Sequence, residues 1–464
     1  MKISTKKLIY HCLYMALIIC SMVFLPHLSD FRSASIAGTI ISALVLIMNI
    51  GYSKKLLSPA NIILICFILF QFGLPILYAI DPGYQNWYLQ QMSPNSLTKN
   101  AIFSIICIES FSYGLIVIHK IGNKERKNKG FLSDDNKKTI LAFSKILLAV
   151  TGIIAVPLGI YVSYLGITHG YGYVKDDSMN IYNGITRFAQ EFFVAAVILC
   201  IVFSENKNSK KIYVLVALLY SVILILSGAR TVSLAILLTL LFVKNEEGVK
   251  YKAKKAFAII LGIIMIAFIG SAIAEQRYAG KVNEQTMTER AESVVEEMGF
   301  NFTTINYVES FVPSTKDYQY GKTYIKSAIS LVPKTLDPTG TIERINETVP
   351  ETELAKWLSA RYGKLYSFGV GYSVIAEAYY NFGYMGFVCV FIQGVIIGAL
   401  MARVGDTKFR RYVTYIMLFA LLTYPRRSFL TLLKSIEYYI IFIIAGIYVL
   451  SYRNKKNVAK EICE

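Results

Sequence analysis

The chain has 464 residues, of which 55% are hydrophobic and 17% are charged, and its mean hydropathy is +0.49. Soluble globular chains rarely combine these values, so the composition excludes a soluble enzyme and predicts an all-α polytopic membrane protein. The formal net charge is +18. In a membrane protein, lysines and arginines retained on the cytoplasmic side explain such an excess, and we therefore expect no nucleic-acid partner.

Apolar runs of spanning length predict a series of transmembrane helices along the chain. The runs lie at about Leu8–Pro26, Ser35–Ile50, Asn61–Ile80, Ala101–Ile118, Leu141–Leu165, Arg187–Phe203, Ala256–Ala274, Phe382–Met401 and Ile436–Tyr452, with a shorter run at Tyr412–Tyr424. The first run resembles a signal sequence, but it is too long and no small-x-small cleavage site follows, so we expect an uncleaved span.

The run from Tyr213 to Val243 is apolar except for the stretch SGAR, which ends at Arg230. One helix of this length would reach about 46 Å, beyond a hydrocarbon core of about 30 Å. It would also put the basic loops SENKNSKK and KNEEGVKYKAKK on opposite sides of the membrane, although basic loops tend to stay in the cytoplasm. We therefore predict a two-helix hairpin, about twelve spans in all, cytoplasmic termini, and Arg230 at the outer interface.

The same alternation of loops divides the chain into four parts. Residues 1–274 are expected to form an N-terminal bundle of about nine spans, 275–371 a large extracytoplasmic loop, 372–452 the C-terminal helices and 453–464 a cytoplasmic tail. Within the loop, Thr286–Gly299 has a capping pattern and one apolar face, which predicts an amphipathic helix. A second one is predicted in Lys322–Leu336, and both could lie on the membrane surface.

Four arginines gather at the predicted outer face. Arg230 falls in the first turn of a helix, where free N–H groups and a guanidinium can bind the same anion; an arginine reaching lipid headgroups is the alternative. Arg187 is similar, but Glu191 lies one turn later and could simply pair with it. Arg426 and Arg427 are adjacent cations that need an anion, which is either a headgroup or the substrate.

The segment Arg361–Gly386 alternates glycines with aromatic residues. Rings such as Tyr372, Tyr379 and Tyr380 can stack on sugars, although an aromatic belt at the membrane interface would have the same composition. Glu377 is the one acid among them. A lone carboxylate near the outer end of a span has either a proton-transfer role or a structural partner such as an arginine.

Other polar residues give weaker signals. His169 is the only histidine in an extended outer loop, and it could be a proton acceptor or an ordinary exposed residue. Glu109, in the middle of a span, could be a buried hydrogen-bonding group, and the GVIIG pattern at Gly394–Gly398 indicates close helix packing. No CxxC pair, HExxH, GxGxxG, P-loop or Asp-x-Asp motif occurs, so we expect neither a metal site nor a cofactor.

The predicted layout and four short segments resemble the repeat-unit polymerases of bacterial O-antigen and capsule synthesis, the Wzy family. The segments are SGARTVSLAILL, SLVPKTLDP in the large loop, GVGYSVIAEAYYNFGYMG, and RRSFLTLL before the last span. The resemblance implies a glycosyltransferase of the cytoplasmic (inner) membrane that joins oligosaccharides linked to undecaprenyl diphosphate, with membrane lipids and a chain-length regulator as further partners.

The resemblance also implies site residues. Substrate-contacting arginines of the family lie in outer loops, which here correspond to Arg230 and to Arg187, Arg277, Arg426 and Arg427. The arginines would stabilise the diphosphate leaving group, while Glu377 or, as second choice, His169 would accept the proton of the acceptor hydroxyl. Two alternatives stay open: an O-antigen ligase, and a transporter or flippase of lipid-linked oligosaccharide.

Overall fold

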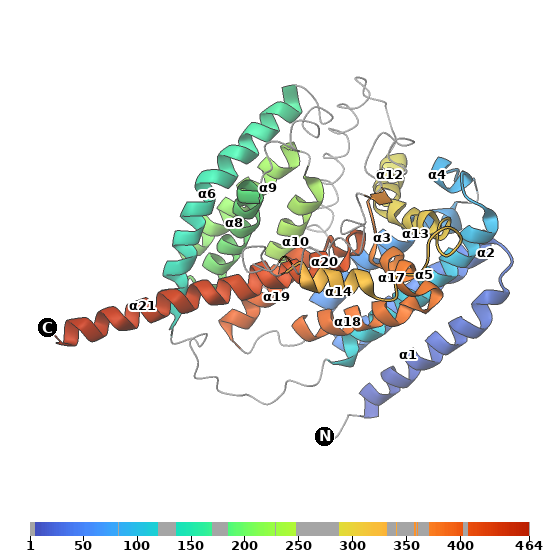
Figure 1. Cartoon of the computed structure of the whole chain (residues 1–464), viewed down its shortest axis with the longest axis horizontal. Coiled ribbons are helices and arrows are strands. Elements are labelled where there is room, and N and C mark those ends of the chain that lie inside the picture. The colour runs from blue at the N-terminus through green and yellow to red at the C-terminus, as the bar shows by residue number, and fades with distance from the viewer. Residues whose placement is uncertain are drawn as a thin grey trace. The chain divides into compact units, whose positions relative to one another are not determined.

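The computed structural model consists of helices joined by turns (Figure 1). It describes residues 5–81, 83–118, 136–168, 184–227, 229–246, 287–331, 340, 357–358, 360, 371–401 and 407–463. No strand occurs within these ranges, and the predicted all-α fold is confirmed.

Eight described helical segments are long and apolar enough to cross a membrane, so the chain is a multi-pass membrane protein. They are Lys7–His27, Phe31–Ser53, Pro59–Ile80, Pro94–Val117, Lys137–Leu165, Lys207–Leu226, Val374–Met401 and Phe429–Arg453. Two shorter apolar helices are Phe188–Phe203 and Val232–Lys244. The run expected at Ala256–Ala274 lies outside the described residues, and the total of about twelve spans stays a prediction.

The chain divides into two compact units, and unit 1 comprises Met1–Asn123, Glu292–Ala402 and Leu421–Lys434. Its elements are α1 (Thr5–Phe24), η1 (Leu25–His27), α2 (Phe31–Ser53), α3 (Pro59–Ile80), α4 (Trp87–Gln90), α5 (Pro94–Val117), most of α12 (Met287–Gly299), η3 (Phe300–Phe302), α13 (Thr303–Glu309), α14 (Lys322–Ile329), α17 (Val374–Phe382), η5 (Gly383–Gly386), α18 (Phe387–Met401), η6 (Tyr424–Arg426) and most of α20 (Phe429–Ile436).

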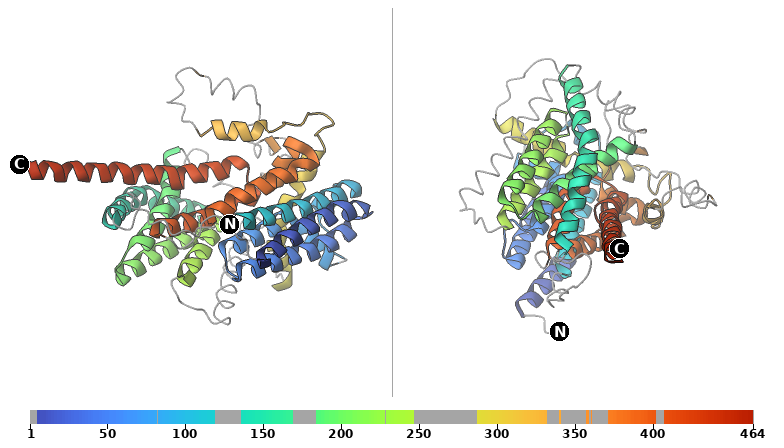
Figure 2. Two further views of the ribbon diagram at one scale, coloured as in Figure 1. Left: turned by 90° about the horizontal axis from the view of Figure 1, so that it is seen from below. Right: turned by 90° about the vertical axis from the view of Figure 1, so that its left-hand side faces the viewer.

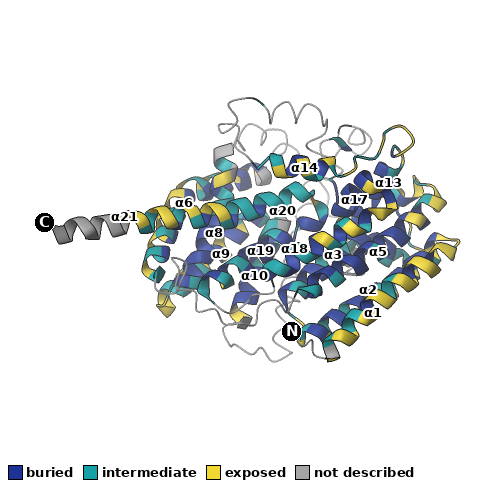
Figure 3. Cartoon of the chain, turned by 60° about the horizontal axis from the view of Figure 1, so that its bottom comes forward, coloured by how far each residue is buried: buried dark blue, intermediate teal, exposed yellow. Residues whose placement is uncertain are grey.

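Helix α5 forms the core of unit 1. In the most apolar part of α5, 78% of the residues are buried, whereas in the corresponding part of α1 only 22% are buried. In Figure 3, α5 is mostly dark blue and α1 is largely yellow and teal. Helices α2, α3 and α18 pack on α5, and Figure 2 shows the blue helices of this bundle running side by side. At its centre the rings of Phe67 and Phe111 stack with centroids 4.0 Å apart.

Glycines let α18 approach α5 closely. A Cβ atom on Gly394 would lie 2.4 Å from the carbonyl oxygen of Phe111, and one on Gly398 would lie 2.5 Å from that of Leu115. No larger residue fits at either position without moving a helix backbone. The packing role predicted for the GVIIG pattern is confirmed.

Unit 2 comprises Lys124–Ala291, Arg403–Ala420 and Ser435–Glu464. Its described elements are α6 (Lys137–Thr168), α8 (Gly184–Phe203), α9 (Lys207–Leu226), α10 (Arg230–Glu246), α19 (Lys408–Leu421), the π-helical η7 (Glu437–Phe442) and α21 (Ile443–Cys463). Helices α9 and α10 pack on each other, and the Ser233 hydroxyl donates to the carbonyl of Ser221 across the pair at 2.9 Å. The predicted hairpin is confirmed.

The amphipathic helices of the large loop also correspond to the expectation. Helix α12 (Met287–Gly299) matches the first, and α14 (Lys322–Ile329) begins at the residue where the second was predicted. The end expected at Leu336 lies outside the described residues.

Candidate active site

The arginine pair predicted from the sequence lies in a tight turn directly before α20. Tyr424, Pro425 and Arg426 form the single 3₁₀ turn η6, which the N–H of Arg427 closes by donating to the Tyr424 carbonyl at 2.8 Å. The guanidinium of Arg426 is half-buried and lies 5.9 Å from the centroid of the Phe70 ring, a cation–π distance. Arg427 is exposed. In this turn, Arg426 therefore packs against α3 and Arg427 is exposed to solvent.

Two buried amide side chains hold this turn. Gln71 on α3 donates to the carbonyl of Pro425 at 2.5 Å, and the hydroxyl of Tyr424 donates to Gln393 on α18 at 2.6 Å. The position of the arginines is thus fixed from two neighbouring helices.

Glu377 lies in the first turn of α17 and is fully buried. Its Oε2 accepts the main-chain N–H of Phe429, the first residue of α20, at 2.6 Å. Its Oε1 accepts the hydroxyl of Thr323 at 2.9 Å, and that hydroxyl in turn accepts an N–H of Asn381 at 2.7 Å. Both carboxylate oxygens are engaged by the protein and no part of the residue is exposed, so in this conformation neither oxygen faces a substrate.

The start of α14 packs on the same helix. Tyr324 meets the Phe429 ring edge to face at 5.3 Å between centroids. Burial and then the charge of Glu377 raise the pKa of Tyr324 well above its usual range. The sequence analysis left two roles open for Glu377, proton transfer or a structural partner such as an arginine. The partners that the structure shows are the N-terminus of α20 and the Thr323 hydroxyl.

The three tyrosines expected to contact substrate are buried, with 1% of Tyr372, 2% of Tyr379 and 1% of Tyr380 exposed. The ring of Tyr380 stacks on Trp357 at 5.5 Å between centroids, and the ammonium of Lys316 lies 5.6 Å from the Tyr380 centroid. In this conformation these rings contribute to packing. Among the described tyrosines near this segment, Tyr320 is 69% exposed and Tyr384 is 42% exposed.

A polar cluster that the sequence analysis missed surrounds Glu309, at the end of α13. Asn100 on α5 donates to Glu309 Oε2 at 2.6 Å and to the side-chain Oδ1 of Asn306 at 2.9 Å. The hydroxyl of Tyr384 donates to Glu309 Oε1 at 3.0 Å, and that of Ser96 donates to Oε2. The carboxylate is half-buried and its orientation is fixed by three donors.

Edge-to-face aromatic contacts surround this cluster. The Phe103 ring lies 5.5 Å from that of Tyr384 and 5.8 Å from that of Tyr379, and Tyr318 lies 6.2 Å from Tyr379, all between centroids. The groups come from segments more than 200 positions apart, since Asn100 and Glu309 are separated by 209. No local pattern links them, although the single acid at the end of a short loop helix was a visible signal.

The other predicted cations belong to unit 2. Arg230 is the first residue of α10, as expected, and Arg187 lies in the first turn of α8; the structure describes their backbone but not their side chains. The hydroxyl of Ser227 closes α9 by donating to the Leu224 carbonyl at 2.9 Å. Arg277 and His169 lie outside the described residues.

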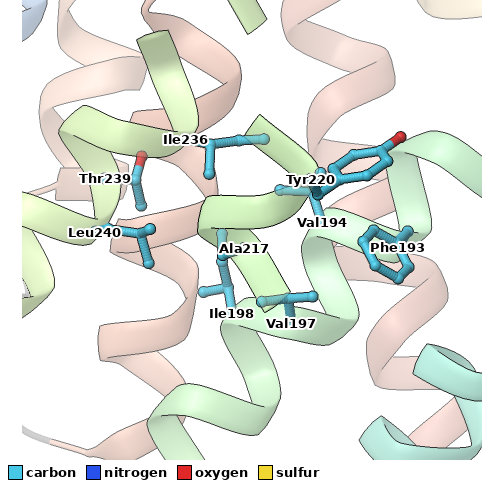
Figure 4. Close-up of a pocket in the computed structure, with 9 residues that line it drawn as sticks. All are labelled: Phe193, Val194, Val197, Ile198, Ala217, Tyr220, Ile236, Thr239 and Leu240. Atoms are coloured by element: carbon cyan, nitrogen blue, oxygen red, sulfur yellow. The ribbon is translucent and has the colours of Figure 1, made fainter. Parts of the chain in front are cut away.

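An apolar pocket lies between three helices of unit 2 (Figure 4). Its lining residues are Phe193, Val194, Val197, Ile198, Ala217, Tyr220, Ile236, Thr239 and Leu240. None is charged, so this pocket does not have the chemistry to bind a diphosphate.

Comparisons with known proteins identify the family. The family model for O-antigen polysaccharide polymerase Wzy matches residues 8–457, nearly the whole chain. No curated protein and no solved structure matches the chain significantly. The family implies a polymerising glycosyl transfer, and the apolar helices place the chain in a membrane. The chain belongs to the O-antigen polysaccharide polymerase Wzy family, and it is an O-antigen repeat-unit polymerase.

Proposed function

We propose that this polymerase uses undecaprenyl-diphosphate-linked oligosaccharides as both donor and acceptor, at the outer face of the inner membrane. The bond from the donor sugar's anomeric carbon to the diphosphate oxygen breaks. A bond from that carbon to an acceptor hydroxyl oxygen forms, the hydroxyl proton passes to a base, and the carrier diphosphate leaves with the bonding electron pair. Charge on the leaving oxygen rises along this path, and fixed cations lower its energy.

This proposal rests mainly on the turn Tyr424–Arg427, here called the arginine turn, whose position is held by hydrogen bonds. A cation accelerates the reaction only if it is already in place when charge develops. The hydrogen bonds from Gln71 to Pro425 and from Tyr424 to Gln393 hold the turn at 2.5 and 2.6 Å. We assign diphosphate binding to Arg427, which is exposed, with Arg426 beside it.

The Glu309 cluster is our proposed contact for the acceptor sugar. A bound sugar is usually surrounded by carboxylates, which accept hydrogen bonds from its hydroxyls, by amide groups, and by partly exposed tyrosine rings. Glu309 and Tyr384 supply these groups, and Tyr384 is 42% exposed. Burial of Tyr372, Tyr379 and Tyr380 gives them a supporting role in this conformation. As proton acceptor we propose His169, the second choice from the sequence, in place of Glu377, whose two oxygens accept protein hydrogen bonds and are fully buried.

Sidedness and the remaining contacts belong to the proposal as well. We propose cytoplasmic termini and an extracytoplasmic loop at 275–371, because the short basic loops then all face the cytoplasm. Arg230, Arg187 and Arg277 are proposed substrate contacts from the sequence alone. A chain-length regulator is a proposed partner, and the division into 1–274, 275–371, 372–452 and 453–464 is the proposed domain order.

Purified protein in lipid nanodiscs, supplied with carrier-linked repeat units, tests the reaction. We expect extension to persist with a chelator present, and Arg427→Ala to lower its rate by about 10²- to 10³-fold. Arg427→Lys keeps the charge, loses the two-pronged contact and should recover part of the rate. Arg453→Ala, which removes an exposed cation from α21, is the control and should extend normally. Full activity of Arg427→Ala, or rescue of a chelated enzyme by a divalent ion, would contradict the proposal.

A further inference from the structure

A series of buried hydrogen bonds links two other segments of unit 1 to the start of α20. It runs from the Asn381 amide to the Thr323 hydroxyl, from there to Glu377 Oε1, and from Glu377 Oε2 to the Phe429 N–H. The Asn381 side chain also donates to the main-chain carbonyl of Glu377 at 2.8 Å, and its Oδ1 accepts the N–H of Gly321 at 2.9 Å. The series therefore joins α17, the start of α14 and α20.

Glu377 caps α20 from a helix that is 52 positions away in the sequence. The first N–H groups of a helix have no partner within that helix, and the partial positive charge there favours a carboxylate. Because Glu377 is fully buried, removing its carboxylate would leave the Phe429 N–H and the Thr323 hydroxyl without their acceptor. The cap thus fixes where α20 begins.

The arginine turn is continuous with that helix start. Arg426 is three positions and Arg427 two positions before Phe429, and the other end of the turn is held by Gln71 and Gln393. We infer that Glu377 is a positioning residue, whose carboxylate caps α20 and thereby holds Arg426 and Arg427 where they bind the diphosphate of the carrier lipid. This inference rests on the diphosphate role proposed for the two arginines.

The hydrogen bonds of Glu377 favour a positioning role over a role as the base that takes the acceptor's proton. A general base needs an oxygen within hydrogen-bond reach of the substrate hydroxyl. Both oxygens of Glu377 already accept protein hydrogen bonds, of 2.6 and 2.9 Å, and no part of the side chain is exposed. Glutamine at this position can still accept from the Phe429 N–H but cannot take up a proton at neutral pH.

Two substitutions at Glu377 give opposite expectations for the two roles. In the nanodisc assay, Glu377→Gln should keep the extension rate within about threefold of the wild type, whereas loss of a general base costs about 10²- to 10⁴-fold. Glu377→Ala removes the cap and should lower the rate by about 10²-fold, as a misplacement of about 1 Å can do. A well-expressed, monodisperse Glu377→Gln protein without activity would overturn the positioning role in favour of the base.

A double-mutant cycle tests whether Glu377 acts through the arginines. If it does, adding Glu377→Ala to Arg427→Ala should lower the rate by far less than the Glu377→Ala change does alone. Glu109→Ala is the matched control, because Glu109 is equally buried in unit 1 but accepts from Ser21, at 2.6 Å. Its effect should add to that of Arg427→Ala.

Each outcome has a distinct meaning. Additive losses for Glu377→Ala and Arg427→Ala would refute the positioning role and leave the diphosphate role intact. An active Arg427→Ala protein together with an active Arg426→Ala protein would refute the diphosphate role itself, and with it this inference. Thr323→Val, which removes one of the two hydrogen bonds to Glu377, should give a smaller loss than Glu377→Ala, and Thr323→Ser should recover it.

Discussion

The side-chain amide of Gln71 donates a 2.5 Å hydrogen bond to the main-chain carbonyl of Pro425, 354 positions later in the chain. Gln71 is fully buried on α3, a helix of spanning length, whereas Pro425 is the middle residue of the arginine turn. A spanning helix therefore fixes the backbone of a segment to which we assign substrate binding. This arrangement resembles other binding sites in which a rigid scaffold positions a loop.

Gln71→Leu tests this contact. Leucine has a similar volume but leaves the Pro425 carbonyl without its donor, a loss of about 1–3 kcal/mol. We expect normal amounts of folded protein and an extension rate about tenfold lower, since about 1.4 kcal/mol corresponds to one factor of ten. Gln90→Leu, at an exposed position on α4, is the control. A wild-type rate for Gln71→Leu would mean that the turn is held without this bond.

Gly394→Val should prevent folding of unit 1. A Cβ atom there would lie 2.4 Å from the Phe111 carbonyl oxygen, so α5 and α18 would have to separate. We expect the variant to be nearly absent from the membrane fraction and monodisperse protein to be lost on detergent extraction. Val388→Ala, at a position 46% exposed on the same helix, should accumulate normally. Equal yields of both proteins would show that the two helices can adjust.

Much of the fold could be predicted because its signals are local. The break at SGAR, the start of α12 and the contact of Gly394 with α5 follow, in that order, from hydropathy, capping and small-residue patterns within short segments. Helix α17 was not separated from α18 in this way. Glycine at 383 allows the break, with φ of 57° and the Tyr318 hydroxyl 2.9 Å from where a Cβ would lie, and neither condition is visible in a hydropathy run.

The sequence indicated which types of residue form the candidate site, but not which residues contact one another there. An acid and two adjacent arginines stood out because they are rare near apolar spans. That Glu377 binds the N–H of Phe429, or that Asn100 holds Glu309, depends on contacts between segments 52 and 209 positions apart. A single sequence carries no information on such pairs until the helices are placed. The burial of Tyr372 is a packing outcome of the same kind.

The pH dependence of stability can be tested at Glu296 on α12. Burial raises the pKa of this carboxyl above its ordinary value; the hydrogen bond from Asn86 opposes the change and the charge of Glu292 adds to it. The folded state therefore holds the proton more tightly, and stability is lost as pH rises from the ordinary carboxyl pKa through the raised one.

Glu296→Gln removes this ionisation and keeps an acceptor for the Asn86 amide. We expect a higher Tm than the wild type at neutral pH and a flatter dependence of Tm on pH across that window, measured by thermal unfolding in detergent. Glu297→Gln, an exposed position on the same helix, is the control. If the Tm of Glu296→Gln depended on pH as steeply as that of the wild type, ionisation of Glu296 would not be the cause of the pH dependence.

Cysteine labelling with a membrane-impermeant maleimide tests sidedness. Tyr320→Cys, at a position 69% exposed beside α14, should react in intact spheroplasts. Lys207→Cys, exposed at the start of α9, should react only after the membrane is opened. The reverse labelling pattern would show that the membrane topology is the inverse of the one proposed, with the arginine turn on the cytoplasmic side.

The last prediction concerns Arg230 and separates three reactions in cells. Arg230 is the first residue of α10, where helix N–H groups and a guanidinium can bind one phosphate together. Arg230→Ala should leave protein in the membrane and abolish chain extension, and Arg230→Lys should restore part of it, because lysine keeps the charge but not the two-pronged contact. Surface glycan and carrier-linked glycan run on one gel provide the measurement.

A cell with a defective polymerase still exports and ligates repeat units, so the surface of Arg230→Ala cells should carry single repeat units in place of a ladder of long chains. Loss of a ligase would instead leave polymer on the carrier lipid, and loss of a flippase would trap unpolymerised units inside the cell. Either of those patterns would oppose the assignment to this family. A normal ladder from well-expressed Arg230→Ala cells would return this arginine to an ordinary contact with lipid headgroups, because a residue that binds the leaving diphosphate cannot be removed without slowing the bond cleavage that it assists.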